Sequence, residues 1–324
     1  MILLWGLPAD GPLAAVRAAL DRRGVRAAFA DQRLVLDSSM ELEVGAAVGG
    51  RLQVGGQRVD LGSVDAAYLR PYDSRQHPDV RRAGPESSAW SHAVGLDQAL
   101  WAWAEVADAL VVNPPAAAAA SGSKPLQAAL LRRHGFRVPE TLVTTDPQAA
   151  RAFWERHGRV VYKSISSIRS IVAQLTADHA RRLEDVTSCP TQFQQHVAGV
   201  DHRVHVVGDE LFCATVVSPA DDYRYAGRSG TSAEVRPAAL EPDCADRCRR
   251  LAAALGLPVA GIDLRRTPAG EWYCFEVNAS PAFTWYDRPP GQRVAQAIAR
   301  LLCDAGAGRR WGAGADAPAV YRSR

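Results

Sequence analysis

The N-terminal segment alternates short apolar runs with one amphipathic stretch. Residues 2–5 are an apolar run of strand length, and residues 25–30 form a second one. Between them, residues 13–23 carry apolar side chains at helical spacing, with Pro12 at the start and Gly24 at the end. These are typical places for the two residues in a helix. A strand, a helix and a strand in this order predict a small parallel α/β domain.

The same mixed pattern continues to residue 110. Residues 71–88 are polar and rich in Arg and Pro, which indicates a surface loop. A turn is expected at Gly49-Gly50, between two runs of alternating polarity. The strands expected in this part cover residues 34–44, 51–61 and 65–69, and a helical period covers residues 90–110.

The pattern changes at residues 111–115, where two valines are followed by Asn-Pro-Pro, and we place a domain junction there. Beyond it, helical periods alternate with strand-like runs. Helices are expected over 124–134, 146–157, 243–255 and 293–302. Strands are expected over 139–143, 159–163, 171–175, 191–197, 204–207, 211–217, 261–266 and 272–277.

Composition narrows the class of protein. The 324 residues carry a formal net charge of +3, from 38 Lys+Arg against 35 Asp+Glu, so charge gives no case for a nucleic-acid partner. Six irregularly spaced cysteines argue against a disulfide framework and favour a reducing compartment. No apolar run is uninterrupted enough to cross a membrane. We therefore expect a cytoplasmic protein with neither a nucleic-acid nor a membrane partner.

Three oxygen-bearing side chains occur on the last predicted hairpin. Glu276 and Asn278 are two residues apart on one strand, so they point to the same face. A turn at 267–270 brings Asp263 of the other strand opposite them. Such a set suits a hard cation such as magnesium. The alternative is a solvated carboxylate and an asparagine that starts a turn, but carboxylates within apolar strands need a partner.

Lys124 and Lys163 are the two lysines of the chain, which uses arginine elsewhere. Lys124 starts a predicted helix and Lys163 ends a predicted strand. A lysine at each place supplies a point charge for nucleotide phosphates. A surface lysine is the alternative for either one alone.

Further motifs complete an ordered series between the lysines and the hairpin. Phe193-Gln194-Gln195-His196-Val197 leads into Gly199-Val200-Asp201-His202-Arg203, and Asp263 and Glu276-Val277-Asn278 follow. In this order the chain resembles the ATP-grasp superfamily. Within it, the chain looks most like the branch that contains ribosomal-protein glutamate ligases and graspetide synthetases, which form ω-ester or ω-amide bonds in peptides. The resemblance covers residues 110–303.

The resemblance implies an α/β chain with an ATP-grasp fold, in which two α+β subdomains clasp ATP. The expected divisions are a small parallel α/β domain over 1–110, the two subdomains over 111–195 and 196–304, and a flexible tail over 305–324. It also implies ATP and two magnesium ions as cofactors, with Mn²⁺ as a substitute ion.

Roles for individual residues also follow from the resemblance. Asp263, Glu276 and Asn278 would bind the two metal ions, with Glu276 bridging them. Lys124 and Lys163 would contact phosphates, Gln194, Gln195 and Val197 would face the adenine, and Asp201 the ribose. Arg203 would lie near the γ-phosphate or an acyl phosphate. The usual glycine-rich flap is replaced here by a serine-rich segment, in which Ser166 and Arg169 would cover the phosphates.

Three arginines are candidates for substrate contacts. Arg224 and Arg228 lie in a polar loop and are expected to clamp a substrate carboxylate or the acyl phosphate, although an ordinary exposed loop is an equal alternative. Arg70 ends a predicted strand of the first domain, from which it would reach the cleft; a purely structural arginine is the stronger alternative. His202 and His205 are expected to face away from Arg203 and to be structural.

The resemblance, together with these residues, implies an ATP-dependent carboxylate–amine ligase that forms an acyl phosphate and releases ADP and phosphate. Such chemistry requires no protein nucleophile, and the chain has no convincing Ser/His/Asp or Cys/His motif. The acceptor is a free amino acid or a peptide; a peptide macrocyclase is the alternative within the same chemistry. A nucleotide-binding protein without ligase activity is the alternative from another class. A homo-oligomer is left open.

Overall fold

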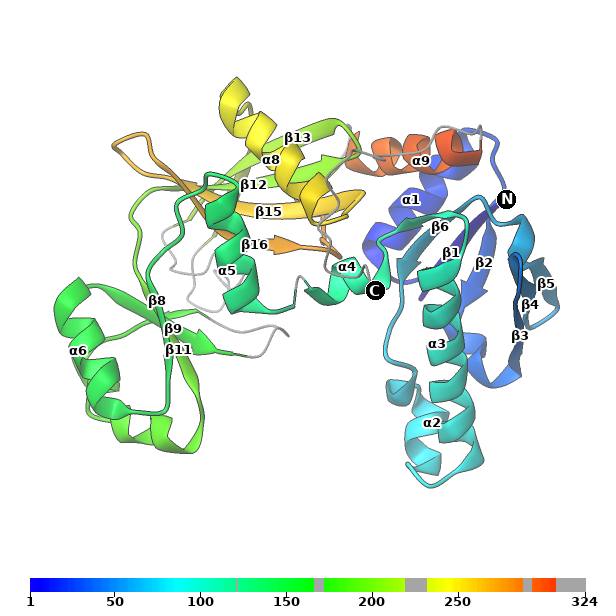
Figure 1. The fold of residues 1–324 in the computed structure, drawn as a ribbon, viewed down its shortest axis with the longest axis horizontal. Coiled ribbons are helices and arrows are strands. Elements are labelled where there is room, and N and C mark those ends of the chain that lie inside the picture. The colour runs from blue at the N-terminus through cyan, green and yellow to red at the C-terminus, as the bar shows by residue number, and fades with distance from the viewer. Residues whose placement is uncertain (121, 166–171, 219–231, 288–292, 307–324) are drawn as a thin grey trace.

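The described residues form two halves, joined through a short helix, that together carry four β-sheets. The structure is a computed structural model that describes residues 1–120, 122–165, 172–218, 232–287 and 293–306. The N-terminal half carries a parallel sheet and a small antiparallel one, and the other half carries two antiparallel sheets (Figure 1). The predicted mixed α/β class is confirmed.

The N-terminal parallel sheet is buried on both faces. In spatial order its strands are β2 (Ala28–Asp31), β1 (Ile2–Gly6), β6 (Ala66–Arg70) and β7 (Leu110–Val112). Leu3 and Trp5 pack under α3 (Ser88–Val106), whereas Ile2 and Leu4 pack under α1 (Gly11–Arg22) and α9 (Arg293–Gly306). Alternate side chains of a strand point to opposite faces, so an unbroken apolar run is what a doubly covered strand requires.

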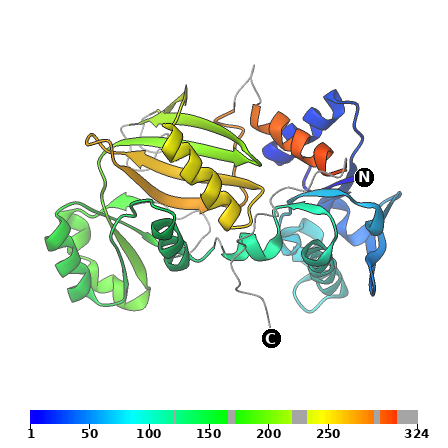
Figure 2. The same ribbon diagram turned by 45° about the horizontal axis from the view of Figure 1, so that its top comes forward.

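The C-terminal helix α9 belongs to the N-terminal core in space. Its buried residues Val294, Ile298 and Leu302 share a cluster with α1, and α9 lies beside α1 in two views (Figures 1 and 2). At the other predicted boundary, β7 carries the first sheet to Val112. The divisions at residues 110, 195 and 304 stay predictions, and most of the predicted tail, residues 307–324, lies outside the described residues.

The small sheet differs from the prediction at its start and at its turn. It consists of β3 (Ser38–Val44), β4 (Val48–Val54) and β5 (Gln57–Asp60). The strand predicted from residue 34 was wrong there, because residues Gln32–Asp37 form a 3₁₀ helix whose start is capped by Asp31. Gly49-Gly50 lies inside β4, where Gly50 has a φ of 128° and a Cβ would lie 2.1 Å from the carbonyl oxygen of Glu41. The glycine therefore permits a close backbone approach.

The prediction of a surface loop over residues 71–88 was wrong. It forms a 3₁₀ turn (Ser74–Gln76) and helix α2 (Pro78–Ala83) before α3 begins at Ser88. Side chains of Asp73, His77 and Ser87 cap the three starts. Val80 is fully buried and anchors α2.

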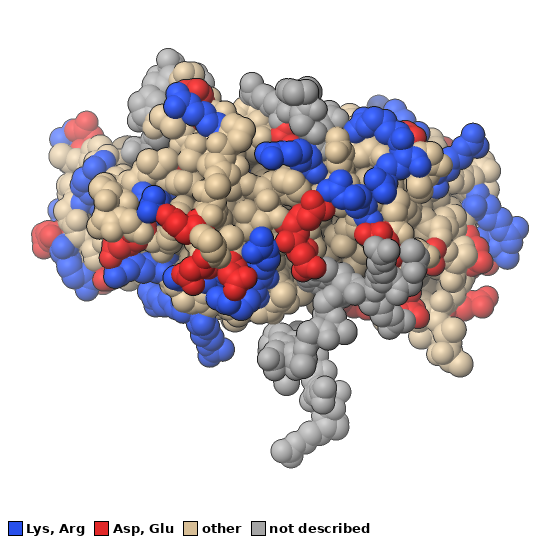
Figure 3. All heavy atoms as spheres, turned by 90° about the horizontal axis from the view of Figure 1, so that it is seen from above, with Lys and Arg blue, Asp and Glu red and all other residues tan. Residues whose placement is uncertain are grey.

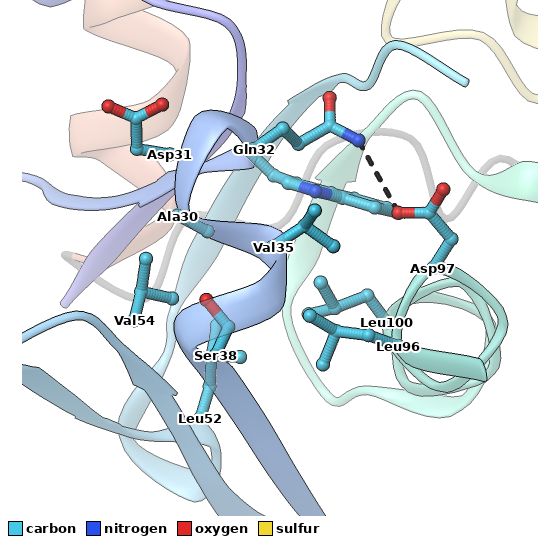
Figure 4. Close-up of a pocket in the computed structure, with 11 residues that line it drawn as sticks. Ala30, Asp31, Gln32, Val35, Ser38, Leu52, Val54, Leu96, Asp97 and Leu100 are labelled. Atoms are coloured by element: carbon cyan, nitrogen blue, oxygen red, sulfur yellow. Dashed lines mark hydrogen bonds between the residues drawn. The ribbon is translucent and has the colours of Figure 1, made fainter. Parts of the chain in front are cut away.

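A buried polar contact fixes this segment to α3. Asp97 of α3 accepts a hydrogen bond from Ser74 Oγ at 2.9 Å. It accepts a second one from Gln32 Nε2 at 3.4 Å (Figure 4). Burial raises the pKa of Asp97 above its usual value. The cavity that Gln32 and Asp97 border with Val35 measures ≈ 10 Å³, about the room that one water needs. It is too small for a substrate.

The second half begins with a sheet that helix α6 covers on one side. Its order is β10 (Ala173–Gln174), β9 (Val160–Ser164), β11 (Thr191–Gln195) and β8 (Thr141–Thr144). Phe153 of α6 (Pro147–His157) packs on Val160 and Phe193 in one buried cluster. A short helix, α7 (Ala177–Ala180), and a 3₁₀ helix (Leu183–Ser188) precede β11.

The last sheet is the largest and carries helix α8 on one face. Its order is β14 (Glu234–Ala238), β13 (Glu210–Val217), β12 (Val200–Val207), β15 (Val259–Arg266) and β16 (Trp272–Asn278). Figure 2 shows α8 (Pro242–Ala254) lying across this sheet. Two further helices, α4 (Pro115–Ala120) and α5 (Lys124–Arg133), lie along the chain between β7 of the N-terminal half and β8. The predicted last hairpin, β15–β16, is confirmed, and the strands predicted over 204–207 and 211–217 pair as β12 and β13.

The surface has charges of both signs. Basic and acidic side chains are interspersed on the face shown in Figure 3. None of the helices in the described ranges combines the length and the apolar character that a membrane crossing needs.

Candidate functional site

The face of the large sheet away from α8 carries the oxygen-bearing residues of the last hairpin. Asp263 of β15 is paired directly with Glu276 of β16, and Gly261 is paired with Asn278. The intervening Ile262 and Val277 point the other way, into the core under α8. The alternation of buried and exposed positions therefore brings two carboxylates and one carboxamide together on one face.

This set of donors fits a hard cation by its chemistry. Carboxylate and amide oxygens are the ligands that Mg²⁺ takes in proteins, usually together with phosphate oxygens. In the part of the chain that the structure describes, no three His, Cys, Asp or Glu side chains are grouped closely enough to hold a metal ion. Asp263, Glu276 and Asn278 would supply two carboxylates and one amide oxygen to an ion held here.

Arg203 of β12 forms an ion pair with Asp263 of the neighbouring strand β15. Its Nη1 donates to Asp263 Oδ1 at 2.7 Å, and the side chains are 6% and 21% exposed. The guanidinium lies over Gly261: a Cβ built on that glycine would be 2.4 Å from Arg203 Nη2 and 2.6 Å from Pro281. The ring of Tyr286 covers the guanidinium at 5.5 Å. Arg203 therefore reaches the carboxylate through a space that only glycine leaves open.

His205 corrects one prediction about the histidines. It lies two residues after Arg203 on β12, so both point to the same face, and Arg203 Nε donates to His205 Nε2 at 3.4 Å. The expectation that His205 faces away was wrong because it misjudged the two-residue period. His202 does face away and packs on Trp272, with ring centroids 4.8 Å apart.

The stability of the protein is expected to depend on pH through His205. Burial, and next the charge of Arg203, lower the pKa of His205 well below its ordinary value. Below about pH 6.5 the imidazole of His205 is protonated in the unfolded chain but stays neutral in the folded chain. The free energy of unfolding therefore falls as the pH drops through 6.5. Between pH 7 and 5 this amounts to up to about 2 kcal/mol. Urea unfolding of the wild type and of His205→Gln, which keeps an acceptor, should show the smaller loss in the variant; equal losses would contradict it.

Lys124 stands at the start of α5, which is docked on the edge of the large sheet. Gln127, one turn further on, exchanges two hydrogen bonds with the backbone of Val277: its Nε2 donates to the carbonyl at 2.7 Å, and its Oε1 accepts from the N–H at 3.0 Å. Lys124 Nζ donates to the carbonyl of Ser164 at 3.1 Å. Lys124 thus bridges the helix on one sheet and the last residue of β9 in the other.

Lys163 lies on the face of its sheet that α6 does not cover. It is paired with Gln192 of β11, and Gln194 shares that face because it is two residues further on. Phe193 points the other way, into the cluster with α6. The two lysines are therefore brought to the same end of β9, and their contact with phosphates stays a prediction.

The residues proposed to face the adenine have partners within the protein. Gln194 Nε2 donates to Thr141 Oγ1 at 3.0 Å, and the Gln195 N–H donates to the carbonyl of Glu140 at 2.9 Å. These contacts fix the strand that leads from β11 toward the large sheet. Their proposed role in binding adenine stays a prediction.

Asp201 is held by a second arginine on the large sheet. Arg265 Nε and Nη2 donate to its two carboxylate oxygens at 2.7 and 2.9 Å, and Arg265 Nη1 donates to the carbonyl of Val197 at 2.7 Å. Burial raises the pKa of Asp201, an effect that Arg265 opposes. Arg265 therefore links Asp201 to Val197, which lies two residues after the end of β11.

Four candidate residues lie outside the described residues. They are Ser166 and Arg169, in the segment expected to cover the phosphates, and Arg224 and Arg228, in the expected substrate loop.

Three residues of the site were missed from the sequence. Gln127 is a polar side chain on the buried side of α5, four residues before the buried Leu131, and this interruption of an apolar stripe was a usable signal. Arg265 and Gly261 alternate with the apolar residues of β15 and so share the face of Asp263; the same two-residue spacing that selected Glu276 and Asn278 would have found them.

Comparisons with known proteins agree with this architecture. The RimK-like ATP-grasp domain matches residues 121–302. A probable alpha-L-glutamate ligase of Xanthomonas oryzae pv. oryzae is 33% identical over 147 residues, or 45% of this chain and 46% of that protein. One of Marinobacter nauticus is 28% identical over 200 residues, or 58% of this chain and 65% of that protein. The chain thus spans less than two thirds of the length of either relative.

Solved structures match almost the whole chain. The ATP-grasp ligase PsnB, complexed with a phosphomimetic variant of its minimal precursor, Mg and ADP, is 27% identical with a TM-score of 0.79 and covers 94% of this chain and 98% of that one. The macrocyclase MdnC of Microcystis aeruginosa MRC, bound with the precursor peptide MdnA, shares the fold at 23% identity, with a TM-score of 0.79 over 93% of this chain and 98% of that one. The predicted ATP-grasp fold is confirmed, and because the matched domain spans more than half of the sequence, the chain belongs to the RimK-like ATP-grasp family.

Proposed function

We propose that the protein is an ATP-dependent ligase that joins a carboxylate to an amine through an acyl phosphate. The observation that carries the proposal is the shared face of Asp263, Glu276 and Asn278 beside Arg203. Lys163 lies near the end of β9 in the adjacent sheet, and Lys124 of α5 donates to the carbonyl of Ser164, the last residue of that strand. Hard oxygen donors next to fixed positive charges are what the transfer of a phosphoryl group requires.

Successive residues along the site would bind successive parts of ATP, from the adenine to the phosphates. Gln194, Gln195 and Val197 would hold the adenine, and Asp201 the ribose. Lys124 and Lys163 would hold phosphate oxygens, and the segment with Ser166 and Arg169 would cover them. The support for this order is that the strand ending at Gln195 leads directly to Asp201 and then along β12 to Arg203.

Asp263, Glu276 and Asn278 would hold magnesium, which when bound neutralises phosphate charge and polarises the group being transferred. Two ions, and Mn²⁺ as a substitute, are part of the proposal. Arg203 is fixed beside Asp263 by its ion pair and by Tyr286. It would orient the acyl phosphate and stabilise the oxyanion formed when the amine attacks.

The reaction balances without a protein nucleophile. A carboxylate oxygen of the substrate attacks the γ-phosphorus, the bond to the β–γ bridging oxygen breaks, and ADP leaves. The amine nitrogen then attacks the acyl carbon, inorganic phosphate leaves, and the amine loses a proton to solvent. Arg224 and Arg228 are proposed to hold the substrate carboxylate for the first step.

We propose a peptide as the substrate. The support is that the ATP-grasp ligase PsnB, described in complex with the precursor peptide PsnA2, matches 94% of this chain at 26% identity. Within this class, closure of a side-chain ester or amide in the peptide is one outcome, and addition of a free amino acid is the second. Mass spectrometry of peptides incubated with ATP separates them: closure removes one water per bond, and addition adds one amino-acid residue.

Replacing Lys163 with Ala is expected to weaken ATP binding by about tenfold, the loss of one charge-assisted hydrogen bond. Calorimetric titration with ATP measures it. The matched control is Arg151→Ala, an exposed basic residue on α6 of the same subdomain. Equal affinity of the two variants would return Lys163 to an ordinary surface lysine.

A further inference from the structure

The three candidate metal ligands are not held equally by the fold. Asp263 and Glu276 lie within paired strands, so the ladder of β15 and β16 fixes their backbones. Asn278 is the last residue of β16, and its side chain is exposed. A ligand at a strand end needs support from elsewhere to keep its orientation.

That support begins with the turn that follows the strand. The N–H of Ser280 donates to Asn278 Oδ1 at 2.8 Å, which sets the direction of the amide oxygen. The next contacts come from outside the hairpin. Asn113, at the junction with the N-terminal half, donates through Nδ2 to the carbonyl of Ala279 and to that of Val259.

Arg70 reaches the same turn from the N-terminal sheet. It ends β6, and its Nη1 donates to Ser280 Oγ at 2.9 Å and to the carbonyl of Pro281 at 3.2 Å. Its Nε and Nη2 donate to Asp10 at 2.6 and 3.2 Å. The phenol of Tyr68, whose pKa burial raises to about 12, interacts with the same guanidinium.

These contacts commit the arginine to the protein. A guanidinium has five N–H donors in a fixed fork, and four hydrogen bonds go to Asp10, Ser280 and Pro281. The side chain is 11% exposed. A substrate carboxylate would have to displace Asp10, so Arg70 is better suited to fix the turn than to bind substrate.

We propose that Arg70 is a positioning residue that holds the metal ligand Asn278 in place through Ser280, so that the N-terminal domain completes the metal site of the ligase core. The inference rests on the proposed function, because it assumes that Asn278 binds the ion. Asp10 neutralises and orients the guanidinium, and the hydroxyl of Ser280 transmits its position to the turn.

Mn²⁺ binding, followed by electron paramagnetic resonance of the free ion in the presence of a non-hydrolysable ATP analogue, tests the proposal. Arg70→Gln and Ser280→Ala should each weaken Mn²⁺ binding by about tenfold, the range for residues that orient a ligand. Arg70→Lys should recover part of the affinity. Binding of the analogue without metal should be unchanged in these variants. A general structural defect would weaken binding of the analogue as well as binding of the ion.

The matched control is Arg33→Gln, which breaks another Arg–Asp pair of the same domain, with Asp31 at 2.7 Å. Ser280→Ala keeps the Arg70–Asp10 pair and decides the matter if Arg70→Gln does not fold. Wild-type Mn²⁺ affinity in a folded Ser280→Ala or Arg70→Gln protein would overturn the inference and leave the proposed function standing. Failure of the wild type itself to bind Mn²⁺ with the analogue would overturn both.

Discussion

Replacing Glu276 with Gln is expected to lower ATP turnover by at least about 10³-fold while the protein stays folded. Glu276 faces Asp263 across the hairpin, and its charge is needed wherever a cation is held by only two carboxylates. A bound metal supplies several kcal/mol of transition-state stabilisation, and each 1.4 kcal/mol is about tenfold in rate. Magnesium-dependent release of ADP, with circular dichroism to confirm folding, measures the effect.

Glu271→Gln is the control for this change. Glu271 lies just before β16 of the same hairpin, but it pairs with Arg137 at 2.8 Å on the surface. The control should keep wild-type turnover. Near-wild-type, magnesium-dependent turnover by folded Glu276→Gln would remove the metal assignment.

Replacing Gly261 with Ala is expected to lower turnover by about 10²-fold and to cost about 1–3 kcal/mol of stability. The added methyl would meet Arg203 Nη2 at 2.4 Å and Pro281 at 2.6 Å, so the arginine must leave its position over the strand. Overpacking of this kind costs about that much free energy, and a displacement of about 1 Å at a reacting group can cost about 10²-fold in rate. Kinetics and thermal unfolding of the same variant measure both.

Gly95→Ala provides the comparison. Gly95 lies within α3, and a methyl group added there would meet no atom within 4 Å beyond its own helix backbone. The change should therefore leave turnover unaltered and slightly favour the helix. A Gly261→Ala protein that matches Gly95→Ala in turnover would show that the position of Arg203 does not matter.

Most strands and long helices could be predicted because their buried positions are apolar and recur with the period of the strand or helix. The hairpin β15–β16 was found from alternate apolar residues, and that alternation also brought Asp263 and Glu276 together. The segment over 71–88 was misjudged because polar residues and Pro78 suggest a loop. Its helix α2 is short, and its order comes from side-chain caps and from Val80, which only the packed N-terminal core buries.

Two contacts of the site depend on segments that are distant in the sequence. Gln127 acts through the backbone of Val277, 150 residues away. Arg70 and Ser280 are separated by 210 residues, and they meet only because the N-terminal sheet packs beside the hairpin. No local pattern reports such a pairing, whereas the shared face of Arg203 and His205 was present in their spacing and was misread.

The products of ATP turnover test the account most directly. Purified protein is incubated with ATP, magnesium, hydroxylamine and a panel of peptides, and the nucleotides, free phosphate and hydroxamate are measured in the same reaction. We expect ADP and inorganic phosphate in equal amounts, together with hydroxamate from the acyl phosphate that hydroxylamine intercepts, because lysines and metal about the terminal phosphates would direct the carboxylate to the γ-phosphorus. AMP and pyrophosphate would contradict it, because they would mean attack at the α-phosphorus. If no peptide supports ATP turnover, the alternative of a nucleotide-binding protein without ligase activity is favoured.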